Sequence, residues 1–505
     1  MLNLFKVIKY QLYLLQLENY ELGRFWKLLL KKGFWPKEGQ RKNLVWTMKA
    51  VLIFGLTELV IFGLSLWMAR LLFLNALENT VAAFVAGLGV FYFFQFCGFI
   101  FLSLSTILLI PADWLVKQVI INRAQFKIKR LKDLKIIGIA GSYGKTTMKE
   151  VLRAVLSSKY HVASAPESVN TPVGIARWVL KNFESTFPSP QPSPARGEGG
   201  QYEIAIIEMG EHYKGDVEEI CNIAKPDVAV VTGINEAHLE RMKTLENITD
   251  TVFEVVSKSK AGALIVLNGD DKNVTENYKN YIWPDHKLEF YGKNSSKSKF
   301  QISNFKFDTE KLGWDAIIDG GEKIFINLLG GYALGDVMAA VKIAQSLGMN
   351  NEEILNGIAN IKPVEHRLQP IKSAGGVLVI DDAYNGNPAG VVEAIKVLLR
   401  FQNRRKLFIT PGLVETGKAT VEIHREIGKQ LAEVADVVIL IRNSVTGYIE
   451  EGINESSKYQ VASSKYKKPE VIYFNTAQEA HSSLSKILQP NDVIVFQNDW
   501  GDQYI

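Results

Sequence analysis

The sequence predicts an α/β protein in three parts: an N-terminal region with two membrane helices, a central P-loop nucleotide-binding domain with a parallel sheet, and a C-terminal Rossmann-like domain. Two apolar stretches of membrane-spanning length come first. Beyond them, apolar strands alternate with helical stretches, which is typical of a parallel sheet covered on both faces. A glycine-rich segment, IAGSYGKTTMKE, lies between one such strand and a helix. The predicted domains are residues 1–130, 131–362 and 363–505.

The two apolar stretches are about residues 50–69 and 81–110. Lysine and arginine cluster before the first stretch and after the second. The positive-inside rule therefore places these two ends of the membrane region in the cytoplasm and the short loop between the stretches outside. A pair of buried core helices is the alternative, and the lengths of the stretches disfavour it. Glu58 and Gln95 could face each other between the helices, since a polar side chain in a span needs a partner. Residues 4–35 mix basic and apolar side chains at helical spacing, which predicts an amphipathic helix on the membrane surface.

Composition narrows the possible partners. The net charge is +5, and the basic clusters flank the apolar stretches, so we expect membrane contact and no nucleic-acid partner. The two cysteines, Cys97 and Cys221, imply no disulfide framework. The insertion at 185–201 is rich in proline, serine and glycine and cannot form a packed core. We expect a disordered surface loop there, with a proline-rich docking site as the alternative.

Two series of strands follow the membrane region. The first contains KIIGIAG, YEIAIIEMG, DVAVVTGI and ALIVLNGD, and each strand is followed by a helical stretch. The second contains VLVIDDAY, KLFITPG, DVVILI, VIYF and DVIVFQ. Each series predicts a doubly wound unit with its own core.

The glycine-rich segment is not a full Walker pattern, because Ile139 stands where the first glycine would be. The glycines that remain still allow backbone N–H groups to surround phosphate oxygens at a helix N-terminus. Lys145 would neutralise the outer phosphates, and a threonine hydroxyl would hold Mg²⁺. We therefore predict an ATP and Mg²⁺ site in this loop. It consists of Gly141, Ser142, Tyr143, Gly144, Lys145, Thr146 and Thr147.

Further segments occur in a characteristic order after the loop. They are SVNTPVGIA (168–176), EMGEHYKGDVEEI (208–220), VVTGINEAHLERM (230–242), EHRLQP (365–370) and VIDDAYNGNPAG (379–390). Together with the loop they resemble the Mur ligase family, ATP-dependent enzymes that build the peptidoglycan stem peptide. DDAYNGNP is the most specific segment, and it looks like the member that adds D-alanyl-D-alanine to UDP-N-acetylmuramoyl-tripeptide. The resemblance covers roughly residues 131–505.

The resemblance implies a carboxylate–amine ligation. The carboxylate of a muramoyl peptide would attack the γ-phosphate of ATP to give an acyl phosphate, and an amino acid or D-alanyl-D-alanine would displace phosphate. Catalysis of this kind consists mostly of positioning and charge neutralisation. Catalytic roles would fall to Lys145, His238 and Arg367. Thr146 and Glu208 would hold Mg²⁺, with His238 near a second ion or the acyl phosphate.

The same resemblance assigns binding residues. Tyr332, Asp336 and Asp382 would contact the nucleotide, the first two near the adenine and the last at the ribose. Asp336 would accept a hydrogen bond from the adenine but not donate one. Arg367 would reach the γ-phosphate. The substrate residues would be Asn170 and Thr171, with Asn385 and Asn387 shaping the loop after Asp382.

Four departures from the family pattern stand out. Val252 occupies the place of a carbamylated lysine, so the metal site is weaker, or Asp250 replaces the ligand, or ligation has lapsed. Tyr332 and Asp336 replace a histidine and an asparagine. QNDWGDQY, residues 497–504, replaces a segment that binds the incoming amino acid. Membrane helices occupy the place of the domain that holds the uridine nucleotide.

The leading interpretation is a ligase anchored in the bacterial cytoplasmic membrane, with its catalytic domains facing the cytoplasm. The replaced domain suggests the hypothesis that the muramoyl acceptor is lipid-linked rather than UDP-linked. Other interpretations are a different envelope amide ligase of the polyglutamate type, a nucleotide-binding scaffold without activity, and a transporter ATPase.

Overall fold

The computed structural model describes most of the chain and divides it into two compact units, Met1–Val119 and Ile120–Ile505, each taken here by itself. The described residues are 5–36, 44–76, 80–166, 169–183, 202–236, 239–292, 302–318, 321–384, 386–414, 416–460 and 468–497.

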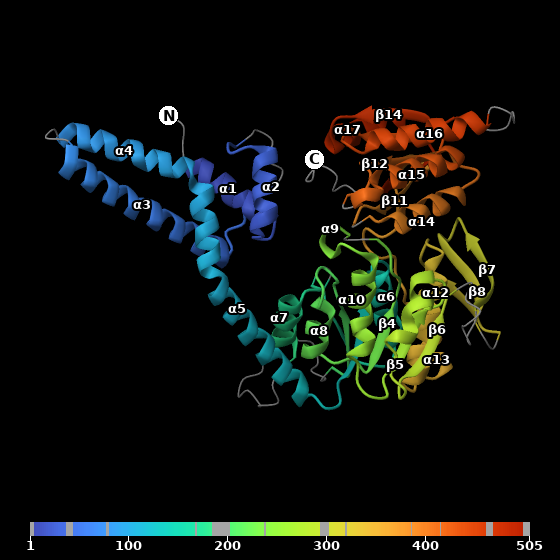
Figure 1. The fold of residues 1–505 in the computed structure, drawn as a ribbon. Helices are drawn as coiled ribbons and strands as arrows, with labels where there is room; N and C mark the ends of the chain where they lie inside the picture. The colour runs from blue at the N-terminus through green and yellow to red at the C-terminus, as the bar shows by residue number, and fades with distance from the viewer. Residues whose placement is uncertain are drawn as a thin grey trace. The chain divides into compact units, whose positions relative to one another are not determined.

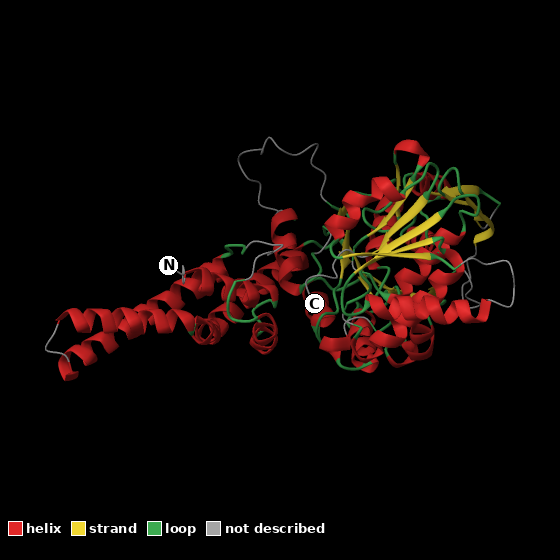
Figure 2. Cartoon of the chain, turned by 90° about the horizontal axis from the view of Figure 1, so that it is seen from above, coloured by secondary structure: helices red, strands yellow, loops and turns green. Residues whose placement is uncertain are grey.

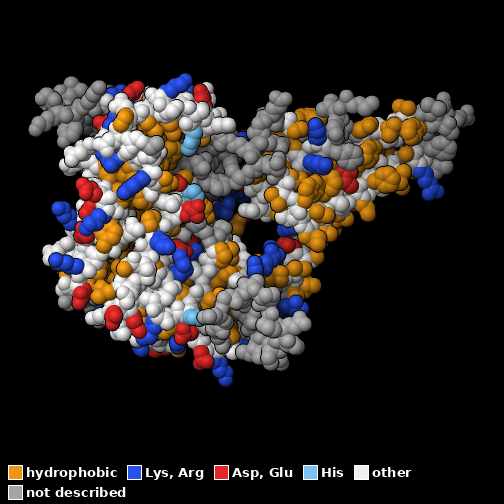
Figure 3. Space-filling model, turned by 180° about the vertical axis from the view of Figure 1, so that it is seen from behind, with side chains coloured by type: hydrophobic (Ala, Val, Ile, Leu, Met, Phe, Trp, Pro, Cys, Tyr) orange, Lys and Arg blue, Asp and Glu red, His pale blue; other side chains and the backbone are white. Residues whose placement is uncertain are grey.

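The N-terminal unit is helical throughout its described part (Figure 1). Its helices are α1 (Phe5–Leu17), α2 (Leu22–Lys32), α3 (Met48–Ala76), α4 (Thr80–Phe96) and α5 (Gly98–Arg130), the last of which continues into the second unit. By length and composition, two segments in the described residues could cross a membrane: Met48–Leu71 and Gly98–Arg130. Figure 3 shows hydrophobic side chains gathered on the surface of this unit.

The second apolar stretch, predicted as one span over 81–110, is divided between α4 and α5. The chain turns at Cys97, and α1 packs closely against the following Gly98: a Cβ at this glycine would lie 2.5 Å from Ile8 Cγ1. Helix α5 then continues through Pro111, which removes a single helical hydrogen bond, to Arg130. The break at Cys97 and the length of α5 therefore differ from the predicted single span.

The prediction that Glu58 and Gln95 face each other is confirmed. Gln95 Nε2 donates to Glu58 Oε2 at 2.8 Å. One residue earlier on α3, Thr57 Oγ1 donates to Ser105 Oγ of α5 at 3.0 Å. Hydrogen bonds of this kind hold helices together in an apolar environment.

The central part of the second unit is built on a parallel sheet with strand order β2-β3-β1-β4-β5-β6. Successive residues of β1 enter different cores: Ile137 packs with α6, α12 and α13, and Ile136 packs with α7, α8 and α10. The sheet is therefore covered on both faces, as the apolar strands predicted, and Figure 2 shows helices on both sides of the strands. Its strands are β1 (Lys135–Ala140), β2 (Val162–Ser164), β3 (Ile204–Glu208), β4 (Val228–Val231), β5 (Leu264–Asn268) and β6 (Lys287–Tyr291).

The helices around this sheet are α6 (Lys145–Leu156), α7 (Pro172–Asn182), α8 (Asp216–Ile223), α9 (Leu239–Met242), α10 (Leu245–Ser257), α11 (Lys272–Asn277), α12 (Tyr332–Ser346) and α13 (Asn351–Ala359). An antiparallel sheet of β7 (Ile302–Asp308), β8 (Gly313–Ile318) and β9 (Lys323–Ile326) precedes α12. Trp314 and Ile326 of that sheet pack into the same core as α6 and α12.

The C-terminal part has a mixed sheet with strand order β10-β11-β15-β12-β13-β14, parallel except that β10 runs antiparallel to β11. The strands are β10 (Gln369–Lys372), β11 (Leu378–Asp382), β12 (Lys406–Thr410), β13 (Val437–Ile441), β14 (Glu470–Phe474) and β15 (Val493–Gln497). The helices are α14 (Pro388–Leu399), α15 (Thr420–Val434), α16 (Thr446–Gln460) and α17 (Ala477–Ile487). This is the predicted Rossmann-like unit with an added antiparallel edge strand.

Candidate active site

The glycine-rich loop runs from the end of β1 to the first residue of α6. Gly141 and Gly144 have φ values of 144° and 79°, in the region that favours glycine. A Cβ at Gly141 would collide with Thr232 Oγ1. Glycine is therefore required here by both the backbone conformation and the close approach of the loop after β4.

Lys145, the first residue of α6, is held by a carboxylate that sequence reasoning missed. Its Nζ lies 2.8 and 3.0 Å from the two carboxylate oxygens of Glu211, and it also donates to Gly141 O. The side chains of Lys145 and Glu211 are 12% and 2% exposed. Glu211 thus neutralises the lysine that the loop would present to phosphate.

Thr146 and Glu208 lie together, as the predicted magnesium site requires. Thr146 Oγ1 is 3.3 Å from Glu208 Oε2, and Lys149 Nζ is 3.4 Å from the same oxygen. Lys149 is 1% exposed and also donates to Ala165 O at 3.1 Å. A hydroxyl and a carboxylate are hard oxygen ligands that suit Mg²⁺.

Within the described residues, no group of three or more His, Cys, Asp or Glu is arranged to hold a metal, so Thr146 and Glu208 are the described residues that would hold Mg²⁺. Val252 is fully buried in the core, and Asp250 accepts a hydrogen bond from Tyr281 at 2.5 Å. His238 and Asn385 lie outside the described residues.

The predicted binding residues differ in what they contact. Asn170 Oδ1 lies 3.5 Å from His212 Nε2, and its main-chain oxygen accepts from Gly210 at 2.9 Å. Thr171 Oγ1 accepts from Gly174 N and caps α7, which is a structural role. Asn387 likewise caps α14, and its Oδ1 also accepts from Asn235 Nδ2 at 3.4 Å. Asn387 therefore links the loop after β4 to the start of α14.

A cavity of about 660 Å³ brings most of the predicted residues together. It opens at the carboxyl ends of the central strands, where ligands bind in open parallel sheets. Gly141 and Thr171 are not among its described lining residues. The predicted residues that line it are Ser142, Tyr143, Gly144, Lys145, Thr146, Thr147, Asn170, Glu208, Tyr332, Asp336, Arg367, Asp382 and Asn387.

Asp336 on α12 faces this cavity as a buried carboxyl. Its Oδ2 has no hydrogen-bond partner within the described residues. Burial raises the pKa of Asp336 well above its ordinary value, which favours the protonated form of the carboxyl. A protonated carboxyl offers an O–H donor as well as an acceptor, so the role of Asp336 toward adenine stays a prediction.

Glu393 was also missed. Its Oε1 accepts from Gly331 N at 2.5 Å and connects α14 to the start of α12. Two of the missed residues had a weak sequence signal: Lys149 follows Lys145 by four positions on one helix, and Glu211 follows Glu208 by three. Glu393 had none, since its partner is 62 positions away.

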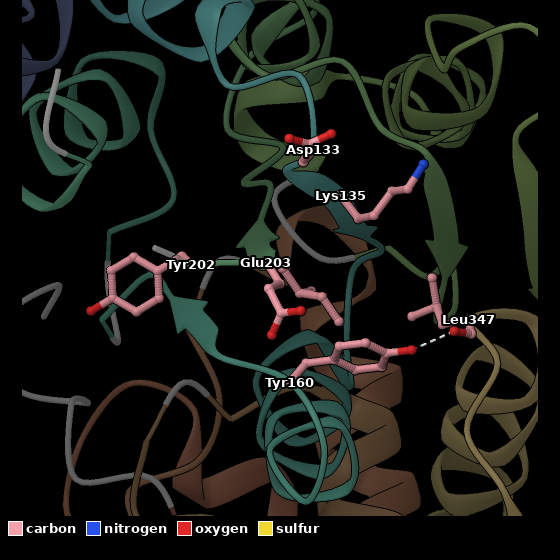
Figure 4. A pocket seen from close by; sticks show the side chains of 7 residues that line it. Asp133, Lys135, Tyr160, Tyr202, Glu203 and Leu347 are labelled. Carbon is pink, nitrogen blue, oxygen red and sulfur yellow. Dashed lines mark hydrogen bonds between the residues drawn. The ribbon is translucent and has the colours of Figure 1, made fainter. Parts of the chain in front are cut away.

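A second cavity, of about 310 Å³, lies at the amino ends of the central strands (Figure 4). It is bounded by Lys135 and Glu203, and Tyr160 closes one side by donating to Leu347 O. This is the opposite end of β1 from the glycine-rich loop. We therefore assign the site to the larger cavity.

The raised pKa of Asp382 predicts that the stability of the folded protein depends on pH. Burial raises its pKa to about 7 from 3.8, although the nearby Arg367 opposes the shift. As pH rises from 4 towards 8, the unfolded chain ionises before the folded one, so the folded state loses stability. Asp382→Asn cannot ionise, and its advantage over the wild type should grow from near zero at pH 4 to at most roughly 4 kcal/mol at pH 8. Urea unfolding at pH 4 and pH 8 measures the difference in unfolding free energy between Asp382→Asn and the wild type, with the exposed Asp133→Asn as control. The same difference at both pH values would contradict the prediction.

The fold and the site define a P-loop nucleotide-binding protein whose cavity is lined from both a central and a C-terminal domain. Comparison with known families agrees: residues 139–344 match the Mur ligase middle domain, and residues 366–497 match the Mur ligase, glutamate ligase domain. The chain belongs to the Mur ligase family, whose members are ATP-dependent, ADP-forming amide ligases.

Individual relatives are distant. The UDP-N-acetylmuramoyl-tripeptide–D-alanyl-D-alanine ligase of Bacillus subtilis is 25% identical over 369 residues, which are 73% of either chain. For the ligase of the same name from Escherichia coli, 25% identity extends over 58% of this chain and only 61% of the relative. The crystal structure of the MurF ligase from Thermotoga maritima in complex with ADP has a TM-score of 0.62 and 25% identity, covering 76% of this chain and 80% of that one.

Proposed function

We propose that this chain is a membrane-anchored ligase that uses ATP to join a muramoyl peptide to D-alanyl-D-alanine or a similar amine. The observation that carries the proposal is the convergence of Lys145, Arg367 and the Thr146–Glu208 pair on one cavity. The relatives named above support the choice of substrates. The proposed reaction forms an acyl phosphate from the acceptor carboxylate, and the amine then displaces phosphate.

In this mechanism, the residues of the chain position anions and neutralise their charge. Backbone N–H groups of the loop at 141–147 would surround the outer phosphates of ATP. Lys145 would exchange Glu211 for a phosphate oxygen. Arg367, from the other side of the cavity, would stabilise the negative charge that develops during phosphoryl transfer. Thr146 and Glu208 would hold Mg²⁺, which would supply further neutralisation of the phosphate charge.

The anchoring part of the proposal depends on the N-terminal unit. Its two long apolar helices expose large hydrophobic side chains, such as Leu59 and Phe62 of α3 and Leu108 of α5. Basic residues flank them, including Lys31 and Lys32 at the end of α2. We infer that α3 and α5 cross the bacterial cytoplasmic membrane and that the catalytic unit faces the cytoplasm.

A single assay tests the substrates. Phosphate release by the full-length protein in vesicles is measured with UDP-linked or lipid-linked muramoyl tripeptide, with and without D-alanyl-D-alanine. We expect release that requires both substrates and is faster with the lipid-linked acceptor. Equal turnover of the two acceptors would remove the case for a lipid-linked substrate. ATP binding without release under any condition would favour a nucleotide-binding scaffold, an outcome that the buried Val252 makes worth testing.

A further inference from the structure

The residues on either side of Arg367 adopt an unusual backbone conformation. His366 and Leu368 have φ values of 55° and 46°, in the left-handed region, which histidine enters more often than most residues but a bulky leucine enters only rarely. Backbone strain of this kind gathers at functional sites. Contacts that hold the segment should therefore be visible on both sides of Arg367.

Those contacts come from the last two residues of β11. Asp382 Oδ1 accepts from Leu368 N at 3.2 Å. Asp381 Oδ2 lies 2.7 Å from His366 Nδ1, and its other oxygen accepts from Ala383 N at 3.1 Å. Because successive strand residues point to opposite faces, the two carboxylates can hold the two sides of the segment separately.

The position of Asp381 is also fixed by its place in the C-terminal sheet. Its strand pairs antiparallel with β10, and Gln369 is the register partner of Asp381. Gln369 Oε1 also accepts from His366 N at 3.2 Å. The imidazole, the carboxylate and the Gln369 side chain therefore form one connected contact at the point where the chain enters the C-terminal sheet.

Arg367 itself is directed into the cavity. Its guanidinium lies 4.9 Å from the Tyr384 ring centroid, and its Nε has no hydrogen-bond partner in the described part of the chain. No described carboxylate lies within ion-pair distance of it. This cation is therefore available to an anionic ligand, and its direction depends on the two residues that flank it.

We propose that His366 and Asp381 form a positioning pair that holds the 366–368 turn and thereby directs the Arg367 guanidinium at the transferring phosphate. The inference rests on the proposed function for the identity of the ligand. Neither residue would touch substrate. Their effect would be on the rate of the chemical step rather than on acceptor binding.

The alternative hypothesis is that the backbone conformation of the 366–368 turn alone directs Arg367, without the His366–Asp381 contact. His366→Gly distinguishes the two hypotheses, because glycine adopts a positive φ without strain but has no imidazole. We expect His366→Gly and Asp381→Asn each to lower kcat by about 10- to 100-fold with little change in KM for the acceptor. The double variant should be no worse than either single one, because both remove the same contact.

Glu365→Gln is the matched control. Glu365 Oε1 lies 3.7 Å from His366 Nε2, but its side chain is 75% exposed. This variant should keep wild-type kcat. Thermal unfolding of His366→Gly, expected at or above the wild-type midpoint, shows whether a loss of kcat comes from misfolding.

A second measurement does not depend on ligase activity. Nitrogen-15 NMR of the histidine rings in the full chain follows the titration of His366 beside Glu365, Asp381 and Arg367. Asp381→Asn should lower the pKa of His366, because it removes the carboxylate that stabilises the imidazolium. An unchanged pKa, or full kcat in His366→Gly, would overturn the pair. A wild type that turns over no acceptor would contradict the proposed function, and the NMR result would still decide on the pair.

Discussion

Lys145→Ala is expected to lower ATP turnover by at least about 10³-fold, the largest effect of any single substitution in the proposed mechanism. Lys145 is the cation at the start of α6, beside a glycine-rich loop that would hold the outer phosphates. Without it, two anions would have to approach each other with less of the γ-phosphate charge compensated, because only Arg367 and Mg²⁺ would remain. The measurement is ADP release by full-length protein under the conditions that give the highest wild-type rate.

Two further variants make the Lys145→Ala result interpretable. Lys135→Ala, at the amino end of the strand β1 that leads into the glycine-rich loop, removes a lysine whose side chain is 54% exposed and should keep the wild-type rate. Lys145→Ala/Glu211→Ala removes the partner carboxylate as well, so that no buried charge is left unpaired. Turnover in the double variant above about a tenth of wild type would mean that Lys145 does not act on phosphate.

Glu211→Gln should have the opposite effect on nucleotide binding. ATP has to displace the Glu211 carboxylate from Lys145, so its removal should tighten ATP binding by about tenfold, or ~1.4 kcal/mol. The same change breaks a buried ion pair, and the nucleotide-free protein should lose about 3 kcal/mol of unfolding free energy. Calorimetric titration with a non-hydrolysable ATP analogue and urea unfolding without nucleotide measure the two effects.

Glu218→Gln is a suitable control for Glu211→Gln. Glu218 also pairs with a lysine, at 2.7 Å from Lys258, but both side chains are at least 40% exposed. Little change in either measurement is expected for it, because exposed ion pairs contribute little to stability. Weaker ATP binding in Glu211→Gln would show that the carboxylate takes part in binding the nucleotide and its metal instead of competing with them.

The features that the sequence predicted are those that depend on local pattern. Apolar strands between helices predicted both doubly wound sheets, and the spacing of Gly141 and Gly144 predicted a tight loop before α6. The Glu58–Gln95 contact was one pairing that the sequence allowed, because a polar side chain in an apolar helix needs a partner, but the sequence did not identify that partner. In each case, the residues that decide the structure lie within one or two elements of the sequence.

The features that were missed depend on contacts between distant segments. The break at Cys97 falls beside Gly98, on which Ile8 packs from some 90 positions away. Asn387 and Thr171 each cap a helix, a contact that the sequence alone did not separate from substrate binding, and their substrate-binding role stays a prediction. The turn around Arg367 had only a weak signal, because histidine is enriched at positive φ but nothing in the sequence marks Leu368 for that conformation.

Helix α5 has a kinetic consequence if its apolar part crosses the membrane. It runs for 33 residues, roughly 50 Å, and only residues 131–134 separate its end from β1. So short a connection keeps the catalytic unit at the bilayer surface, where a lipid-linked acceptor is met by lateral diffusion. The rate would then follow the mole fraction of acceptor among the lipids. Dilution with inert lipid at constant bulk concentration would slow the enzyme on this acceptor and leave its rate on a soluble one unchanged.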